Sequence, residues 1–463
     1  MMQTLLFSGI VALLILEGAL ISFLILKEKN LLLHLSLGLP IAAVLNVLVI
    51  FDWTLLGVDL SFGLLIGEHA IITAILAYLA SKKRAITVSE YVQQGPLSRA
   101  SSLLEWVCMA LIGATVIYSF THAVLLPTFQ YDSATNWTMR SAISFNDRRI
   151  AFDADESRGM AKPQYPFLFH ALQITANQGQ SLGVVLQDEA GWNDRAANSI
   201  LWLLSLGSFI GLFHVIRKTL GKTASLLAVT MILGIPLLSL HLGQGYADIV
   251  LLQELLLSLS CLMVWIRQKN GGFLLLSGLF VTAAVWTKSE GLMTGLIPWI
   301  LSLSTITYLE RERKKEAFIA GAVAVVLSAA WPIFALFKGL SLTPHSADTM
   351  LSFHSEGVQE AIFGLFDRGS FGVTWYVLLV AVPWMLFDII RKRKDVVRNL
   401  VPIGWGILVL LSFLFVYLFT PNVRFLLNAE SYYRQMMIPA AMLILSTCVW
   451  FGKEDQRNHS KIA

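Results

Sequence analysis

The chain has 463 residues, of which 56% are hydrophobic and only 14% are charged, and its mean hydropathy is +0.68. A soluble domain carries about 25% charged residues, so this composition excludes a water-soluble globule of this size. The net charge of +4 excludes little by itself, because its meaning depends on where the basic residues lie.

Apolar stretches of about 20 residues recur along the whole chain, and each is long enough to cross a bilayer as a helix. Strands of a membrane barrel would instead appear as short alternating segments. The pattern therefore predicts an all-α polytopic membrane protein of about 13 transmembrane helices. In chain order the predicted spans are 4–26, 31–51, 62–80, 103–126, 196–216, 223–241, 248–266, 271–287, 291–308, 317–337, 373–390, 400–420 and 435–451.

The first span is too long for a signal peptide and lacks a small-residue cleavage site, so we expect it to remain as a helix. The three cysteines, Cys108, Cys261 and Cys448, fall inside apolar stretches, where packing is a better explanation than disulfides or metal binding.

Lys and Arg residues gather in alternate loops, and this bias predicts the orientation in the membrane. One set of loops, together with the C-terminal tail, holds 23 of the 34 basic residues, and the opposite set holds 11. The set with the excess is predicted to face the cytoplasm. The N-terminus is then outside and the C-terminus is cytoplasmic.

This orientation gives the outer face one large loop, 127–195, and a second polar stretch from Lys338 to Gly372. We divide the chain into three leading helices with a cytoplasmic linker, 1–102, and a membrane domain, 103–463. In the large loop, helical spacing of apolar residues from Ala134 to Phe145, with Arg140 opposite, predicts an amphipathic helix in the headgroup plane. A loop that returns to the membrane suits an enzyme acting on a lipid-borne substrate.

Asp132 is the first acid after the fourth predicted span, at the expected membrane surface. A carboxylate there could serve as a general base. An N-cap or a charge facing the headgroups is the alternative, and seven other acids share the loop.

Four more charged residues stand at the outer boundary of predicted spans: Asp248, Lys288, Glu290 and Arg434. Ionised groups at this depth cost a few kcal/mol unless they are paired or line a cavity. A structural ion pair of Lys288 with Glu290 or Asp248 and a phosphate site are both consistent with this pattern. Arg434 has the planar fork that suits a phosphate, or it extends to the interface.

Two further features are less specific. Glu17 lies in the middle of the first span and is predicted to pair with His34 or Asn46. The stretch from His345 to Glu356 fits no standard metal-ligand spacing, so a solvated loop is favoured there and no metal site is predicted. No nucleotide, dinucleotide or hydrolase motif is present, and no cofactor or nucleic-acid partner is predicted.

Several segments of the outer face together resemble the GT-C superfamily of membrane glycosyltransferases, which take a sugar from a polyprenyl-phosphate carrier. The matching residues are Tyr131-Asp132, Trp137, Arg140, Pro163-Gln164-Tyr165-Pro166, Gly245 to Asp248, Thr287 to Gly291, and Ser431, Arg434 and Pro439. The resemblance covers the chain from about Leu103 onward. Lys162 and Gln164 stand where the family often has His and Asp, which puts an acid or metal role there in doubt.

The resemblance implies an inverting glycosyltransferase of the bacterial cytoplasmic membrane, with its active site on the outer face. Asp132 would be the catalytic base, and Lys288 and Arg434 would neutralise the donor phosphate. Tyr165 and His170 would shape the sugar pocket, with Asp248, Glu290, Arg140 and Lys162 as further donor-binding candidates. The partners would be a polyprenyl-phosphate sugar, membrane lipid and a glycan, lipid or protein acceptor, and two cations would make a metal unnecessary.

Two other functions remain open at this stage. A transporter or flippase for a lipid-linked sugar would explain polar residues at the outer boundary, but not their placement on one face or the lack of an internal repeat. An outer-face ligase or polymerase using lipid-diphosphate glycans is close in chemistry.

Overall fold

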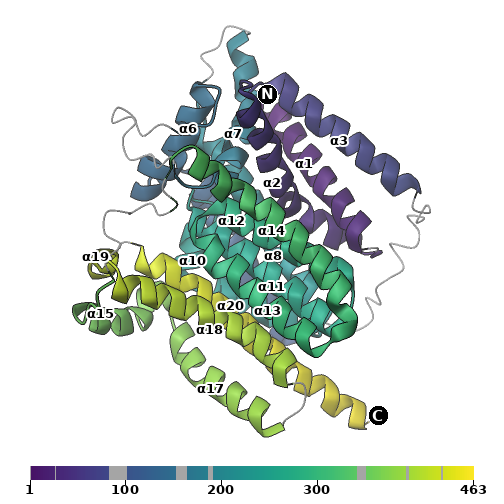
Figure 1. Cartoon of the computed structure of the whole chain (residues 1–463), viewed down its shortest axis with the longest axis vertical. Coiled ribbons are helices and arrows are strands. Elements are labelled where there is room, and N and C mark those ends of the chain that lie inside the picture. Colours follow the sequence, from purple (N-terminus) through teal and green to yellow (C-terminus); the bar gives the residue numbers. More distant parts are fainter. Residues whose placement is uncertain are drawn as a thin grey trace.

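The computed structural model describes residues 2–26, 28–82, 102–152, 164–185, 191–340, 342, 351–392, 396–428 and 431–462. Throughout these residues the protein is helical and has no strand, as the apolar stretches predict. The N-terminus and the C-terminus lie at opposite ends of the molecule (Figure 1). The loop helices α6 (Thr138–Asn146) and α7 (Leu168–Val185) lie at the end that holds the N-terminus.

The first three helices are α1 (Met2–Leu26), α2 (Leu31–Leu56) and α3 (Phe62–Lys82). The backbones of α1 and α2 touch at Gly18 and Gly38, where a Cβ atom on either glycine would overlap a backbone carbonyl of the other helix. Small residues at such a crossing let membrane helices approach closely, which replaces the hydrophobic driving force that lipid does not supply.

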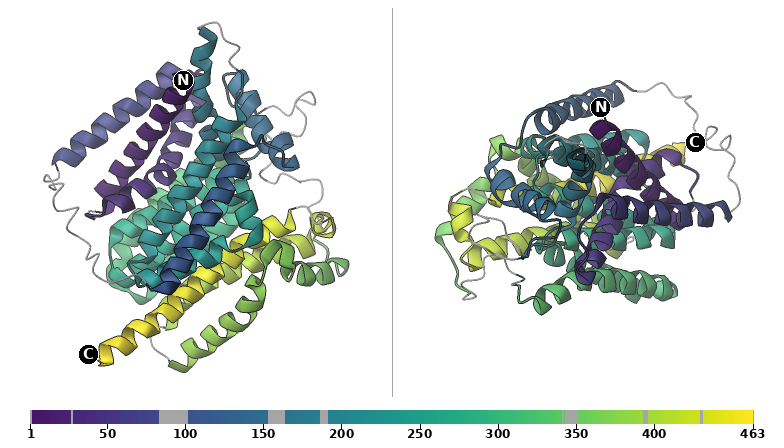
Figure 2. Two further views of the ribbon diagram at one scale, coloured as in Figure 1. Left: turned by 180° about the vertical axis from the view of Figure 1, so that it is seen from behind. Right: turned by 90° about the horizontal axis from the view of Figure 1, so that it is seen from above.

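The rest of the chain forms a helical bundle, which Figure 2 shows from two further sides, and α11 (Ala247–Gln268) is buried along its length. Every residue of its most apolar window is buried, whereas the corresponding windows of α3, α5 and α17 are largely exposed and present apolar side chains to the lipid. The membrane-domain helices are α5 (Leu103–Phe120), which continues as the π-turn η1 (Thr121–Leu125), α8 (Asp194–Ile216), α9 (Lys222–Leu233), α10 (Pro236–His241), α11 (Ala247–Gln268), α12 (Gly271–Thr287), η4 (Leu292–Leu296), α13 (Ile297–Leu309), η5 (Arg311–Arg313), α14 (Lys314–Phe337), α15 (Glu356–Leu365), α16 (Arg368–Phe371), α17 (Thr374–Lys392), α18 (Val396–Phe419), α19 (Val423–Leu427) and α20 (Tyr432–Ile462).

Eleven helices of the described chain are long and apolar enough to cross a membrane. The other two predicted spans coincide with α9 followed by α10, and with α12. Proline at the start of α10 separates it from α9, which has 12 residues, and α12 has 17 residues. At 1.5 Å per residue α12 is about 26 Å long, slightly short of a hydrocarbon core of about 30 Å. The all-α membrane fold is confirmed, and the exact count of 13 is not.

The large loop contains η2 (Ser133–Trp137), α6 (Thr138–Asn146) and α7 (Leu168–Val185). A helix stands where the amphipathic pattern predicts it, but the prediction that Arg140 faces away from the packed side is wrong. Arg140 is only 1% exposed and donates to two backbone carbonyls, from Nη1 to Tyr165 at 2.7 Å and from Nε to Ala151 at 3.2 Å. The irregular loop leaves these carbonyls without helical partners, and a buried guanidinium satisfies them.

A buried polar network joins the three N-terminal helices to α7. Glu17 accepts from His69 Nδ1 at 2.9 Å, and His69 Nε2 lies 3.2 Å from Asn46 Oδ1. The same Asn46 oxygen accepts from Thr175 of α7 at 2.9 Å. The partner of Glu17 is therefore His69, which the sequence prediction missed. His34 contacts Ser22 and the Glu28 carbonyl instead.

Replacing His69 with leucine is expected to lower the free energy of unfolding by about 3 kcal/mol, because Glu17 would remain buried with no partner for its charge. Denaturant titration of the protein in mixed micelles measures this change. Ile71→Ala, on an exposed position of the same helix, is the matched control and should have little effect. Equal stability of the two variants would contradict the role given to the network.

Candidate functional site

Charged side chains from four distant parts of the chain meet beside the N-terminal ends of α11 and α20. Asp248 and Arg434 lie in the first turns of α11 and α20, and Lys288 and Glu290 follow α12. Asp132 immediately precedes η2. We call these five residues the charged cluster: Asp132, Asp248, Lys288, Glu290 and Arg434.

Lys288 is a deeply buried member of the charged cluster and holds two carboxylates. Its Nζ atom lies 2.8 Å from Asp248 Oδ1 and 3.1 Å from Glu290 Oε1, and its side chain is 6% exposed. Burial alone would lower the pKa of Lys288, but the two carboxylates raise it well above its ordinary value. The ammonium group has three donors, and these two partners leave one for a ligand.

Arg434 lies between two carboxylates of the charged cluster, Asp132 and Asp248. Its Nη2 atom donates to Asp132 Oδ2 at 2.8 Å, and its Nε atom lies 3.6 Å from Asp248 Oδ2, beyond a hydrogen bond. The guanidinium carbon stands 4.2 Å from the centre of the Tyr246 ring, a cation–π arrangement. Asp132 is about one-third exposed (33%), so its carboxylate remains open to a substrate.

Aromatic and amide side chains that were not among the predicted site residues complete the surroundings. Trp137 lies under Lys288, with the ring centre 5.7 Å from Nζ. On the other side, Gln435 Nε2 approaches Glu290 at 3.4 Å, and its Oε1 accepts from the Tyr417 hydroxyl at 2.8 Å. Trp137 and Tyr246 stand within the motifs noted in the sequence, and Gln435 adjoins Arg434, but nothing in the sequence signals Tyr417.

Buried side-chain atoms without hydrogen-bond partners gather at this place. In the described part of the chain they include Asp248 Oδ2, Ser289 Oγ, Glu290 Oε2 and Arg434 Nε, together with both amide atoms of Gln244. Buried polar atoms are normally satisfied, so a concentration of them calls for an explanation. Donors and acceptors in this mixture suit a ligand with both hydroxyl and anionic groups.

Tyr165 contacts the charged cluster, whereas His170 and Arg140 contact the residues that surround it. The Tyr165 ring is 5.9 Å from Lys288 Nζ and packs on Trp137, and burial raises the pKa of its phenol. The His170 ring stacks on the Trp137 ring, and its Nδ1 is 2.8 Å from Ser141 Oγ. Burial lowers the pKa of His170, so its ring is neutral. Lys162 lies outside the described residues.

Glycine is required at position 245, between the α10 segment and Tyr246. Gly245 has φ +79°, and a Cβ atom there would overlap the Ser133 hydroxyl at the start of η2. The segment carrying Tyr246 therefore packs directly on the segment carrying Asp132.

The Gly245→Ala variant is expected to lose at least about 1–2 kcal/mol of stability from the left-handed backbone alone, with the overlap in addition. It should also shift Tyr246 and Asp132 relative to each other and reduce activity. Thermal unfolding and turnover measure the two effects. Gly113→Ala in α5, where a Cβ atom meets nothing within 4 Å, is the control. A Gly245→Ala protein with unchanged stability would contradict this argument.

No group of three or more His, Cys, Asp or Glu side chains in the described residues is arranged to hold a metal ion. His354 pairs with Glu356 at 3.1 Å on an exposed turn. His345 and Asp348 of the same stretch lie outside the described part.

Comparison with known proteins gives one family match and several structural matches. Residues 183–342 match the family model described as dolichyl-phosphate-mannose-protein mannosyltransferase. The structure of ArnT from Cupriavidus metallidurans bound to undecaprenyl phosphate superposes with a TM-score of 0.50 at 14% sequence identity, over 75% of this chain and 60% of ArnT. The chain therefore has the same kind of fold as the ArnT structure.

Two further solved structures show weaker matches to this chain. The apo state of the same ArnT gives a TM-score of 0.49 at 13% identity, over 78% of this chain and 62% of ArnT. The apo oligosaccharyltransferase of Archaeoglobus fulgidus gives 0.44 at 11% identity, over 77% and 51% of the two chains. No curated protein sequence matches this chain. The chain thus spans about 60% of the length of the ArnT structure that it resembles.

Proposed function

We propose that this protein is an inverting glycosyltransferase that moves a sugar from a polyprenyl-phosphate donor to a hydroxyl group of a glycan, lipid or protein acceptor. The observation that carries the proposal is the charged cluster itself. It combines a partly exposed carboxylate, Asp132, with two cations that lie on buried aromatic rings. Arg434 is bonded to Asp132, and Lys288 pairs with Asp248, which also lies close to Arg434. A base and a cationic phosphate site are what transfer from a lipid phosphate needs.

The comparisons support the same chemistry by analogy. The matching family model describes transfer of mannose from a lipid phosphate, and the ArnT structure with this fold holds undecaprenyl phosphate. The loop bias in basic residues supports a site on the outer face of the cytoplasmic membrane, with the N-terminus outside and the C-terminus cytoplasmic.

In the proposed reaction the acceptor hydroxyl attacks the anomeric carbon opposite the donor phosphate. The hydroxyl proton passes to the Asp132 carboxylate as the new C–O bond forms. The bond between the anomeric carbon and the phosphate oxygen breaks, and polyprenyl phosphate leaves with the electron pair. Lys288 and Arg434 stabilise the negative charge that develops on that oxygen.

Arg434 has a second role in this scheme, because without substrate it is bonded to Asp132. A carboxylate oxygen that is bonded to a guanidinium is occupied and less available to accept the proton of an acceptor hydroxyl. A donor phosphate competes with Asp132 for Arg434, since guanidinium binds phosphate through two parallel bonds. Donor binding would therefore release the base, which couples activation of Asp132 to the presence of the donor.

The experiment that tests the function is a transfer assay with the purified full-length protein in nanodiscs. The donors are radiolabelled polyprenyl-phosphate hexoses and pentoses, and both transfer to added acceptors and donor hydrolysis are scored. Release of sugar from one donor supports the proposal and begins to name the sugar. If the donors bind but none turns over, the proposal is overturned in favour of a flippase or of a ligase that uses lipid-diphosphate glycans. A flipping assay in proteoliposomes then tests the flippase, and a transfer assay with diphosphate donors tests the ligase.

A further inference from the structure

A chain of hydrogen bonds leads from α18 and the start of α20 to the charged cluster. Tyr417 is only 1% exposed, and its hydroxyl lies 2.8 Å from Ser431 Oγ and donates to Gln435 Oε1 at 2.8 Å. The amide of Gln435 donates in turn from Nε2 to Glu290 Oε1 at 3.4 Å. We call Ser431, Tyr417 and Gln435 the amide relay. It ties two helices to the carboxylate that pairs with Lys288.

The chemistry of the groups fixes the direction of the amide relay. An ionised carboxylate accepts and does not donate, so the NH2 group of Gln435 faces Glu290 and its carbonyl oxygen faces Tyr417. A phenol carries one hydrogen, which Tyr417 places on Gln435, so Ser431 donates to Tyr417. Without the Tyr417 hydroxyl the Gln435 amide could turn over and bring its oxygen against the Glu290 carboxylate. The hydroxyl therefore determines which donor Glu290 meets.

The amide relay leaves the two oxygens of Glu290 in different states. Oε1 meets Lys288 Nζ at 3.1 Å as well as Gln435, whereas the buried Oε2 has no hydrogen-bond partner among the described residues. The Glu290 side chain is 23% exposed and that of Asp248 is 2%, so Glu290 is the more open of the two carboxylates on Lys288. Buried acceptors are normally satisfied, and a ligand that donates to Oε2 would satisfy this one.

We propose that the amide relay positions Glu290 so that its Oε2 atom accepts a hydrogen bond from a hydroxyl group of the donor's sugar. Tyr417 and Gln435 are then positioning residues for recognition of the sugar. This inference rests on the proposed function, in which the donor phosphate binds Lys288 and Arg434. The sugar is joined directly to that phosphate, so its hydroxyl groups come close to the side chains around Lys288. A hydrogen bond to an ionised acceptor is stronger than one between neutral groups.

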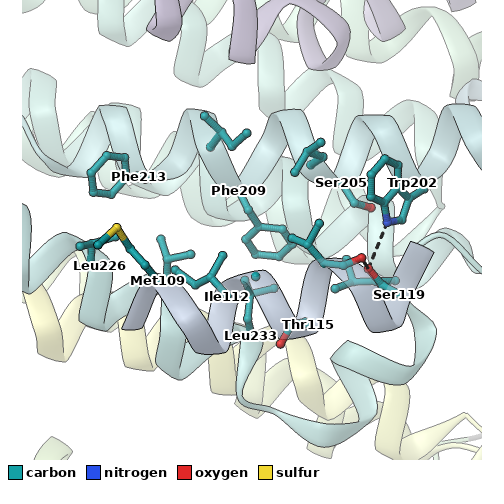
Figure 3. Close-up of a pocket in the computed structure, with 16 residues that line it drawn as sticks. Met109, Ile112, Thr115, Ser119, Trp202, Ser205, Phe209, Phe213, Leu226 and Leu233 are labelled. Carbon is teal, nitrogen blue, oxygen red and sulfur yellow. Dashed lines mark hydrogen bonds between the residues drawn. The ribbon is translucent and has the colours of Figure 1, made fainter. Parts of the chain in front are cut away.

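An apolar cavity elsewhere in the bundle offers a sugar no comparable partner. The cavity has a volume of about 300 Å³ and lies between α5, α8 and α9 (Figure 3). Polar side chains on its wall are paired within the protein: Trp202 Nε1 donates to Ser119 Oγ at 3.0 Å, and Ser205 accepts from Gln253 at 2.7 Å. A sugar among these side chains would lose its hydrogen bonds to water and regain few of them. Glu290 Oε2 is therefore the better partner for a hydroxyl group.

Two neighbouring tyrosines provide a variant and its matched control. Tyr417→Phe removes the hydroxyl and keeps the ring, which packs edge to face against Tyr432. The Tyr432 hydroxyl donates to the Ala361 carbonyl at 2.6 Å and lies outside the amide relay. Each variant loses buried hydrogen bonding, so Tyr432→Phe controls for the cost to stability. Only Tyr417→Phe should change the orientation of Glu290.

Binding is measured for the full chain in nanodiscs with undecaprenyl phosphate, which has no sugar, and with undecaprenyl-phosphate hexoses and pentoses. We expect Tyr417→Phe to weaken binding of the preferred sugar donor about tenfold, the effect of one hydrogen bond to a charged group. Binding of undecaprenyl phosphate should not change. The KM of that donor should rise equally with kcat retained, because the contact is the same in the ground state and the transition state. Tyr432→Phe should bind both lipids as wild type does.

A double variant tests whether Tyr417 acts through Gln435. Gln435→Leu should weaken binding of the sugar donor, and adding Tyr417→Phe should weaken it no further, because the relay is already broken. A further loss in the double variant would show that Tyr417 acts by another route and would contradict the relay.

Other outcomes would also overturn the inference. Equal weakening of both lipids by Tyr417→Phe would assign Tyr417 to the phosphate, and an equal effect of Tyr432→Phe would assign it to packing. Wild type that binds no sugar donor more tightly than undecaprenyl phosphate would reject the sugar contact. A preference for one sugar donor that depends on Tyr417, without turnover, would keep the relay and reject the transfer reaction. Turnover with the same KM in wild type and Tyr417→Phe would do the reverse.

Discussion

Replacing Asp132 with asparagine is expected to lower the rate of sugar transfer by about 10²- to 10⁴-fold, the range that a general base contributes. Asparagine has nearly the same shape and can still contact Arg434 through its carbonyl oxygen, but it cannot accept the acceptor's proton at neutral pH. Donor binding should therefore persist while turnover is lost. Single-turnover transfer and donor binding, measured on the same preparation in nanodiscs, separate the two effects.

The matched control for this variant is Asp147→Asn, which changes an exposed acid of the same loop outside the charged cluster. It should retain wild-type transfer. If Asp132→Asn kept more than about a tenth of wild-type turnover, the assignment of the base would be wrong. Weakened donor binding in Asp132→Asn would instead indicate that Asp132 positions Arg434 for the phosphate.

The second large effect is expected at Asp248, the carboxylate between the two cations. The Asp248→Leu variant should lose about 3–5 kcal/mol of stability, because Lys288 would keep only Glu290 as a partner while remaining buried. Transfer should be lost as well, since both cations would move. Denaturant titration in mixed micelles measures the stability.

A double-mutant cycle distinguishes charge pairing from simple packing at this position. Lys288→Met combined with Asp248→Leu removes both charges of the pair, so the double variant should be much less destabilised than the sum of the single variants. Additive effects would show that the 2.8 Å contact between Lys288 and Asp248 contributes no coupling energy.

The apolar stretches predicted the membrane fold because spanning a bilayer depends on local length and hydropathy. They could not fix the count, since α12 is apolar throughout yet slightly short, and the α9 stretch is divided at Pro236. The contacts between helices could not be predicted either. Glu17 pairs with His69 and not with a residue of the second helix, because α3 packs on α1.

The candidate site was predictable to the level of a shared face. The sequence singles out four charged residues at the ends of predicted spans, because ionised groups at that depth need partners. These residues are Asp248, Lys288, Glu290 and Arg434. From the sequence, an ion pair and a phosphate site are both possible for these charges. In the structure Lys288 and Arg434 form ion pairs, and each still has N–H donors for a ligand. The burial of Arg140 could not be predicted, because helical spacing does not reveal that an irregular loop presents backbone carbonyls to this side chain.

The pairing of Glu17 with His69 has a consequence for how the protein is made. During synthesis α1 emerges first, and His69 follows 52 residues later, while Thr175 is 129 residues beyond Asn46. A charged glutamate in the middle of a helix costs about 2.5–3.5 kcal/mol at insertion, a cost that the otherwise apolar α1 can offset. The N-terminal helices thus enter the bilayer before Asn46 can bond to Thr175, and this contact forms only when α7 docks against them. Docking of α7 is in this way tied to the correct insertion of the first three helices.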